Sequence, residues 1–219
     1  MTGWDTLHTQ ARFRPRYPSE AVVRFLTQWF PGEGALLDVG CGAGRHTLVA
    51  ASEGHRVVAL DTSTEGLKWL WTRCLLEIRP PQRVAVVQGT STALPFPDAT
   101  FDGAIAYGVL YYGTAATFAA AVEELWRVLR PGGRALIVTR TPEDHRLGLG
   151  TRVAPCTTLL DGRAGAEAGM TMYFLPRGAI GPVFGRFAAT VVGQQMSLPP
   201  LAGEERHRVN DDWLIEVQK

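Results

Sequence analysis

The chain has 219 residues, 46% of them hydrophobic and 20% charged, which is typical of a soluble globular protein long enough for one α/β domain or two small ones. The net charge of +1 argues against general binding to nucleic acid or anionic lipid, and no apolar stretch approaches membrane-spanning length. The three cysteines show no metal-binding spacing, and the N-terminus lacks the basic and apolar blocks of a signal peptide. We therefore expect a cytoplasmic protein without a structural metal.

Apolar runs and helical periodicity alternate along the first two thirds of the chain. A first helix is predicted to follow Ser19 and to stop at Pro31-Gly32. Short apolar runs predict buried strands at 35–39, 56–60, 84–87, 101–106 and 135–139. Apolar residues at helical spacing predict intervening helices at about 45–53, 62–75 and 118–129. This alternation favours βαβ units in a doubly wound, Rossmann-like and mostly parallel sheet.

The last third of the chain has a different character. Residues 140–182 are rich in Gly, Arg and Pro and show little periodicity, which predicts an irregular segment that acts as a cap or a mobile insertion. Two more strands are predicted at 187–192 and 213–217, too close together for a helical crossover and therefore antiparallel. They complete a seven-stranded sheet in a three-layer α/β/α fold.

A glycine-rich loop directly follows the first predicted strand. Gly40, Gly42 and Gly44 permit backbone angles and close approaches that a Cβ would block, and the next helix points its first N–H groups at the same space. Asp61 ends the second strand, 21 residues after Gly40, where a carboxylate can accept both hydroxyl protons of a ribose. A glycine-rich turn alone is weak evidence, but together with Asp38 and Asp61 it favours a nucleoside cofactor.

The segment Leu37-Asp38-Val39-Gly40-Cys41-Gly42-Ala43-Gly44-Arg45 resembles the first motif of the class I S-adenosylmethionine-dependent methyltransferases, in particular the bacterial small-molecule branch. Further matches to that family lie at Asp61, 89–98, Phe101-Asp102, 129–133 and, more weakly, Asp212-Trp213-Leu214. The resemblance spans roughly residues 17–140. It implies an enzyme that binds S-adenosylmethionine and transfers its methyl group to a small-molecule acceptor by in-line displacement.

The resemblance also implies contacts along the whole cofactor. Asp38 would help to fix the amino group, Asp61 would bind the ribose hydroxyls, and Thr62 would flank the adenine. Cys41 is interpreted as a small packing residue inside the loop rather than a nucleophile. The full set of implied cofactor residues is Asp38, Gly40, Cys41, Gly42, Gly44, Asp61, Thr62, Thr90, Ser91, Tyr107 and Gly108.

One position departs from the family pattern. The family usually has Asp where this chain has Thr90, an acid that accepts a hydrogen bond from the adenine amino group. A threonine hydroxyl can still accept that bond, but the charge-assisted strength is lost. We therefore expect weaker or rearranged adenine binding, with the backbone N–H of Ser91 as a substitute contact.

Other classes of protein fit the sequence less well. A nicotinamide-dependent oxidoreductase normally has the phosphate loop G-x-G-x-x-G, whereas the spacing here is G-x-G-x-G. The Gly-Lys-Ser/Thr of a P-loop and the G-x-S-x-G of a hydrolase elbow are both absent from the sequence. A non-catalytic S-adenosylmethionine-binding or regulatory protein remains as the alternative, mildly encouraged by Thr90.

The acceptor site is less well defined by the sequence. We expect a single domain over 1–219, with an N-terminal lid and helix (1–30), a cofactor-binding core (35–140), the segment 141–182 as a substrate cap, and C-terminal strands (183–219). Weak catalytic candidates are Tyr17 in the lid and Tyr111 and Tyr112 after the fourth strand, although simple packing explains these tyrosines equally well. Aromatic, histidine and arginine side chains of the lid and the cap are further candidates to shape the pocket.

Overall fold

The computed structural model describes residues 3–197 and 209–219. Positions 1–2, at the start of the predicted N-terminal lid, and 198–208, inside the predicted C-terminal segment 183–219, lie outside the described residues. In the described part of the chain, no helix is both long enough and apolar enough to cross a membrane.

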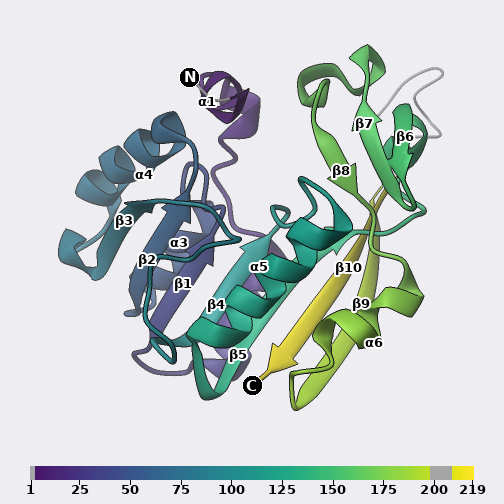
Figure 1. Ribbon diagram of the computed structural model, residues 1–219. Helices are drawn as coiled ribbons and strands as arrows, with labels where there is room; N and C mark the ends of the chain where they lie inside the picture. Colours follow the sequence, from purple (N-terminus) through teal and green to yellow (C-terminus); the bar gives the residue numbers. More distant parts are fainter. Residues whose placement is uncertain (1–2, 198–208) are drawn as a thin grey trace.

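A seven-stranded sheet forms the centre of the fold, in the order β3-β2-β1-β4-β5-β10-β9 (Figure 1). Five strands run parallel, namely β1 (Ala35–Val39), β2 (Arg56–Asp61), β3 (Val84–Gln88), β4 (Phe101–Tyr107) and β5 (Leu129–Arg140). β10 (Asn210–Gln218) pairs antiparallel with both β5 and β9 (Ala189–Ser197). The predicted fold class is therefore confirmed, including the antiparallel C-terminal pair.

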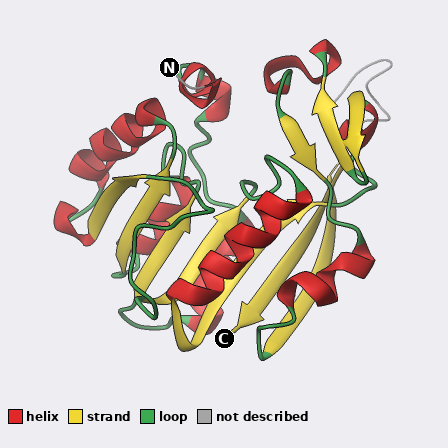
Figure 2. Cartoon of the chain, viewed as in Figure 1, coloured by secondary structure: helices red, strands yellow, loops and turns green. Residues whose placement is uncertain are grey.

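Helices cover both faces of this sheet, as Figure 2 shows. One face packs against α5 (Ala115–Val128) and α6 (Arg177–Phe184), and the other against α2 (Glu20–Trp29), α3 (Arg45–Ser52) and α4 (Thr64–Glu77). Successive residues of β1 belong to the two different cores, because Leu37 packs with α5 and Leu36 with α2. Both side chains are fully buried, which explains why the strands read as continuous apolar runs.

The segment predicted to be irregular has regular structure, so that expectation is wrong. β6 (Gly150–Ala154), β7 (Thr157–Leu160) and β8 (Thr171–Tyr173) form a separate three-stranded antiparallel sheet, flanked by the 3-10 helices η3 (His145–Gly148) and η4 (Gly162–Glu167). Its strands are only three to five residues long, and β6 is exposed along most of its length. Such short strands leave little periodicity to detect in the sequence.

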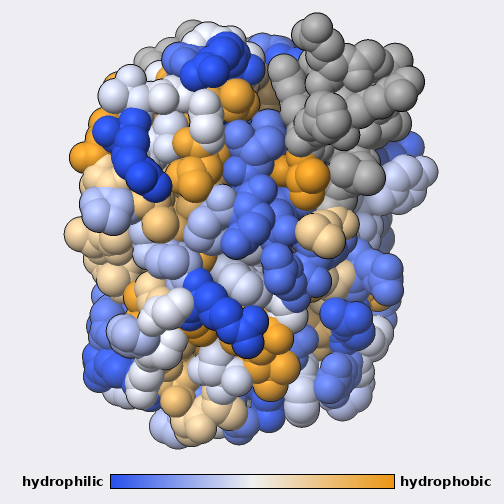
Figure 3. All heavy atoms as spheres, turned by 90° about the vertical axis from the view of Figure 1, so that its right-hand side faces the viewer, coloured by the Kyte–Doolittle hydropathy of each residue, from blue (hydrophilic) through white to orange (hydrophobic). Residues whose placement is uncertain are grey.

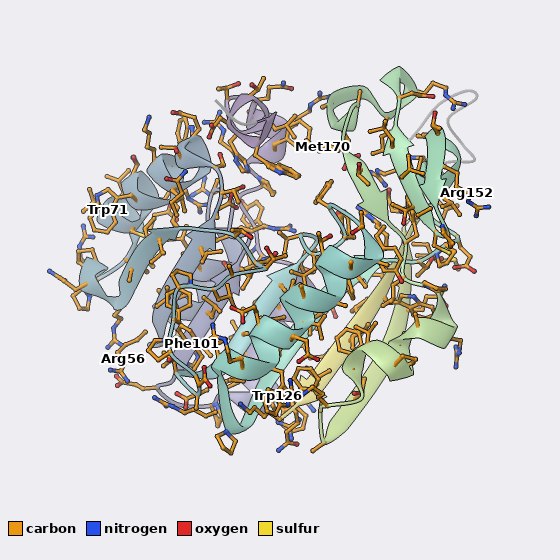
Figure 4. All side chains as sticks on the ribbon, viewed as in Figure 1. Arg56, Trp71, Phe101, Trp126, Arg152 and Met170 are labelled. Carbon is orange, nitrogen blue, oxygen red and sulfur yellow. The ribbon has the colours of Figure 1, made fainter. Side chains whose placement is uncertain are left out.

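The surface on the right-hand side of Figure 1 carries both polar and apolar side chains. In Figure 3, apolar side chains lie as separate patches among polar ones. β9, at the edge of the large sheet, contributes Val191 and Met196, with 66% and 71% of their surface exposed. Helix α4 also exposes Trp69 and Trp71, at 43% and 44%, and Trp71 points away from the sheet in Figure 4. Both side chains therefore lie on the surface of the helix, although apolar residues at helical spacing are more often buried.

The short helix α1 (Gly3–His8) lies across the carboxyl ends of the parallel strands, next to α4 (Figure 1). A 3-10 turn, η1 (Ala11–Phe13), then connects it towards α2. On its other side, α1 approaches the small sheet, because a Cβ placed on Gly3 would lie 3.9 Å from Cε of Met170. Figure 4 shows Met170 between α1 and β8.

Candidate active site

A cavity of about 530 Å³ lies at the carboxyl ends of β1, β2 and β4, covered by α1 and the turn after it. This volume is within the range of small-molecule sites. The cavity is lined by 39–46, 60–62, 89–92 and 107–109, together with Trp4, Leu7, His8, Arg12, Phe13, Pro15, Tyr112 and Thr117. Of the predicted cofactor residues, all except Asp38 line this cavity.

The glycine loop forms the floor. Gly40, Gly42 and Gly44 all have positive φ, at 68°, 53° and 85°, a region in which residues with a Cβ are strained. A Cβ on Gly40 would also overlap Val109, and one on Gly44 would overlap Leu70. The tight turn therefore depends on glycine at these positions, and it directs the start of α3 into the cavity.

Asp61 organises the loop from the end of β2. Its two carboxylate oxygens accept hydrogen bonds from the backbone N–H of Gly42 and of Ser63, each at 2.8 Å. Each oxygen retains a second lone pair, so both can also accept from hydroxyl groups of a ligand. Asp61 is 8% exposed and lines the cavity.

Asp38 lies behind the loop rather than in the cavity wall. Its Oδ2 accepts a hydrogen bond of 2.6 Å from Oγ1 of Thr47, and it also accepts from the Thr47 backbone N–H. Gly44, the N-cap residue of α3, has no side chain to supply such a bond, so Asp38 caps the helix in its place. Burial raises the pKa of Asp38 to about 6, although the bonds from Thr47 oppose this shift. Asp38 thus positions the loop, and a direct contact with a ligand is not what this arrangement favours.

Cys41 and the cavity wall formed by Thr62, Thr90 and Ser91 are polar but uncharged. Burial raises the pKa of the Cys41 thiol well above its ordinary value, so the thiol stays neutral, in keeping with a packing role. Oγ1 of Thr90 lies 2.8 Å from Oγ1 of Thr92 and accepts a hydrogen bond from the Thr92 backbone N–H at 3.1 Å. The Thr90 hydroxyl is therefore already engaged in a local turn, beside Thr62 and Ser91 in the cavity wall.

Arg45 is a cavity residue whose importance the sequence did not reveal. Its guanidinium lies 5.0 Å from the centre of the Tyr107 ring, and His46 packs against the same ring at 4.9 Å. Among the ion pairs found in residues 3–197 and 209–219, none involves Arg45. Burial lowers the pKa of Arg45, a sign that the cation is partly removed from water. Its place directly after the glycine loop was the only available signal.

The three candidate tyrosines lie in different environments. Tyr112 lines the cavity and donates its hydroxyl to Oε1 of Glu167 at 2.6 Å. Tyr111 is 3% exposed, packs beside Arg140 and does not line the cavity. Tyr17 is 76% exposed on the surface, away from the cavity wall. Burial raises the pKa of Tyr112 well above its ordinary value, so Tyr112 keeps its proton.

The small sheet contacts the site only indirectly. No residue of 141–182 lines the cavity. Glu167, which holds Tyr112, also accepts a hydrogen bond of 2.7 Å from Arg146, and Arg146 pairs with the buried Asp144. A network of one buried and two partly buried charges therefore fixes Tyr112 relative to the small sheet.

Known proteins share both the sequence motifs and the fold. Residues 37–137 match the family model described as a methyltransferase domain. An uncharacterised methyltransferase of Mycobacterium bovis is 35% identical over 139 residues, which cover 63% of this chain and 51% of that protein. A demethylmenaquinone methyltransferase of Symbiobacterium thermophilum is 33% identical over 111 residues, covering 49% of this chain and 43% of that protein. The chain thus spans about half the length of the curated relatives it matches.

Solved structures agree with this result at the level of the fold. An S-adenosylmethionine-dependent methyltransferase from Methanosarcina mazei superposes with a TM-score of 0.72 at 18% identity, covering 89% of this chain and 96% of that one. The 1,6-didemethyltoxoflavin-N1-methyltransferase of Burkholderia thailandensis gives a TM-score of 0.64 at 21% identity, with coverages of 99% and 82%. These comparisons show a methyltransferase domain in residues 37–137 and, over most of the chain, the fold of S-adenosylmethionine-dependent methyltransferases; the glycine loop and Asp61 lie together in one cavity of that domain.

Proposed function

We propose that the protein catalyses methyl transfer from S-adenosylmethionine to a small-molecule acceptor by in-line displacement. The observation that carries the proposal is the convergence of the glycine loop, Asp61 and Tyr107 on one covered cavity. These groups lie within the segment that matches the methyltransferase domain.

The residues present fit the cofactor from end to end. Asp61 has free lone pairs for the ribose hydroxyls, and Thr62 and Ser91 line the wall proposed for the adenine. Arg45, which has no ion-pair partner among residues 3–197 and 209–219, offers its guanidinium to the carboxylate of the methionine part. We assign these contacts on chemistry and position in the cavity.

The cofactor supplies an already activated methyl group, bound to a sulfonium. The protein's contribution is then to align the acceptor and to exclude water, and such positioning can lower a barrier by roughly 7–11 kcal/mol. The roof formed by α1 serves both purposes, because Trp4 and Tyr112 both line the cavity and pack edge to face, with their ring centroids 4.5 Å apart. Tyr112 retains its proton and is held by Glu167, so it orients an acceptor rather than acting as a base.

The acceptor side of the cavity favours a small, partly aromatic molecule. Trp4, Phe13, Tyr107 and Tyr112 line it, and the Burkholderia neighbour was solved with a small heterocyclic compound and S-adenosylhomocysteine bound. We propose that the small sheet acts as a cap through Glu167, which fixes one wall of this side.

All three cysteines are free thiols, which supports the expected cytoplasmic location.

Transfer of a labelled methyl group tests the proposal against the non-catalytic alternative. Purified protein is incubated with methyl-labelled S-adenosylmethionine and a fractionated bacterial small-molecule extract, with the Asp61→Ala variant as control. We expect S-adenosylhomocysteine to form together with a labelled product in some fractions. Tight cofactor binding without turnover in any fraction would instead favour a sensor or regulatory protein.

A further inference from the structure

Helix α1 joins the two walls of the cavity through side chains one turn apart. Trp4 contacts Tyr112 on one side, and on the other Nδ1 of His8 lies 2.8 Å from Oγ of Ser63, the N-cap residue of α4. Both Trp4 and His8 line the cavity, so the same face of α1 looks down on the glycine loop.

The His8 ring sits in a slot made by two glycines. A Cβ on Gly42 would lie 3.2 Å from Nε2 of His8, and a Cβ on Gly66 would lie 2.8 Å from its Nδ1. A side chain at Gly66 would displace the ring, and one at Gly42 would crowd it; the ring is 7% exposed. The slot places Nε2 over Gly42, the residue whose backbone N–H bonds to Asp61.

The hydrogen bonds around Ser63 fix which nitrogen of His8 carries the proton. A carboxylate has no proton to donate, so the single hydroxyl proton of Ser63 goes to Oδ1 of Asp5, at 3.0 Å. Oγ of Ser63 also accepts the N–H of Gly66, at 3.1 Å. Nδ1 of His8 must therefore be the donor to Ser63, which leaves Nε2 with a lone pair.

We propose that Nε2 of His8 accepts a hydrogen bond from a ribose hydroxyl of the bound cofactor, so that His8 and Asp61 share the ribose. The inference rests on the proposed function. Nε2 and the Asp61 carboxylate converge on Gly42, and in the described part of the chain no hydrogen bond involves Nε2. Helix α1 would thereby bind the ribose through a hydrogen bond, in addition to covering the cavity.

The electrostatics of the slot agree with a neutral ring. Burial lowers the pKa of His8, against the opposing charges of Asp61 and Asp5, while Arg14 lowers it further. A neutral Nδ1–H ring can accept at Nε2, whereas a protonated ring would present a donor there.

The test is a set of calorimetric titrations in which the protein and the ligand are changed together. Wild-type protein and His8→Phe are each titrated with S-adenosylhomocysteine, its 2′-deoxy and 3′-deoxy analogues, and 5′-methylthioadenosine, which lacks the amino-acid part. We expect His8→Phe to weaken the binding of S-adenosylhomocysteine about three- to tenfold, which is the effect of losing one neutral hydrogen bond. The same substitution should have no effect on the deoxy analogue that lacks the partner hydroxyl, because the bond is already gone.

Trp4→Phe provides the matched control, since it disturbs the same face of α1 without changing a hydrogen-bond acceptor. It should alter the affinity for all four ligands by one common factor. ¹⁵N NMR of the His8 ring gives a second readout: we expect the proton on Nδ1 and a shift of Nε2 when S-adenosylhomocysteine is added.

Three results would overturn the inference. The first is a proton on Nε2 in the free protein. The second is an equal loss of affinity for all four ligands in His8→Phe. The third is a loss of affinity for S-adenosylhomocysteine that is also seen with both deoxy analogues but not with 5′-methylthioadenosine. The last would place the partner on the cofactor's amino group. Absence of binding of every ligand to the wild type would instead contradict the proposed function itself.

Discussion

At the scale of single residues, Arg45 is the group whose role follows most directly from its surroundings. A partly buried guanidinium beside Tyr107, with no ion-pair partner in the described residues, is unfavourable unless a ligand supplies an anion. The cofactor's carboxylate is the anion that the proposed function provides. The other arginine of the cavity, Arg12, is exposed and bonds to Gln10.

We predict that Arg45→Met weakens the binding of S-adenosylhomocysteine roughly ten- to a hundredfold, which is the effect of losing a hydrogen bond between charged groups. Binding of 5′-methylthioadenosine, which has no carboxylate, should not change. Calorimetry on both ligands measures the difference, with Arg12→Met as the control that leaves both affinities unaltered. Equal losses for the two ligands would show that Arg45 shapes the cavity without binding the carboxylate.

Thr90 allows a test of the adenine side. An aspartate at this position can still accept the Thr92 N–H that the threonine hydroxyl holds, and it adds a charged acceptor for the adenine amino group. We predict that Thr90→Asp tightens S-adenosylhomocysteine binding several-fold, whereas Thr90→Asn, of the same shape but neutral, has a much smaller effect. Weaker binding of Thr90→Asp would mean that the adenine is recognised by a different contact.

At the scale of elements, His46 joins α3 to the start of α2. Its Nε2 accepts a hydrogen bond of 3.3 Å from the backbone N–H of Ser19, the N-cap residue of α2. Burial lowers the pKa of His46 from its ordinary 6.5 to about 3, and the charge of Arg45 contributes. Between these two pH values the unfolded chain binds a proton that the folded protein does not, so stability falls as the pH falls.

We predict that His46 contributes a loss of about 1.4 kcal/mol in the free energy of unfolding for each pH unit below its ordinary pKa. His46→Gln, which can still accept from Ser19, should show a flatter acid limb in denaturant titrations between pH 7 and 5. Asp38 and Asp212, whose pKa values burial raises to about 6, act in the opposite direction, but they are the same in both proteins. At pH 8 His46 is neutral in both the folded and the unfolded state, so the difference in stability between the two proteins at this pH is the reference. If the free energy of unfolding of wild type and His46→Gln fell in parallel from pH 8 to pH 5, the assignment would be contradicted.

The elements also show what the sequence could and could not predict. In the βαβ core, β1 and α3 were predicted to within one residue, because the strands are buried on both faces and the helices have one apolar side, whereas α5 and β5 begin three and six residues earlier than predicted. The small sheet was missed, since its strands of three to five residues are too short to show periodicity, and neither its apolar contacts with Tyr111 nor the Arg146–Glu167 ion pair has a periodic signature. The sequence indicated His8 only as one of several lid side chains that could shape the acceptor pocket, and it did not single out Arg45, because only the packing of α1 and α3 shows that these side chains face the cavity.

At the scale of the whole molecule, the fold brings the glycine loop, Asp61 and Tyr112 of the cofactor-binding core together with α1 of the N-terminal segment. The glycine loop and Asp61 come from neighbouring parallel strands, so topology alone predicts that they meet. The roof over them depends on α1, which contacts both α4 and Tyr112. Specific binding of the cofactor nucleoside at Asp61 is therefore the central claim from which the other proposals follow.

The most direct test is calorimetric titration of S-adenosylhomocysteine into wild-type protein and Asp61→Ala. We expect one binding site in the wild type and a loss of roughly a hundredfold or more in the variant, because charged hydrogen bonds to the ribose are removed. Asp98→Asn, at an exposed ion pair with Arg127, is the control and should bind like the wild type. An unchanged dissociation constant in a folded Asp61→Ala protein would contradict the account, because the ribose would then be held elsewhere.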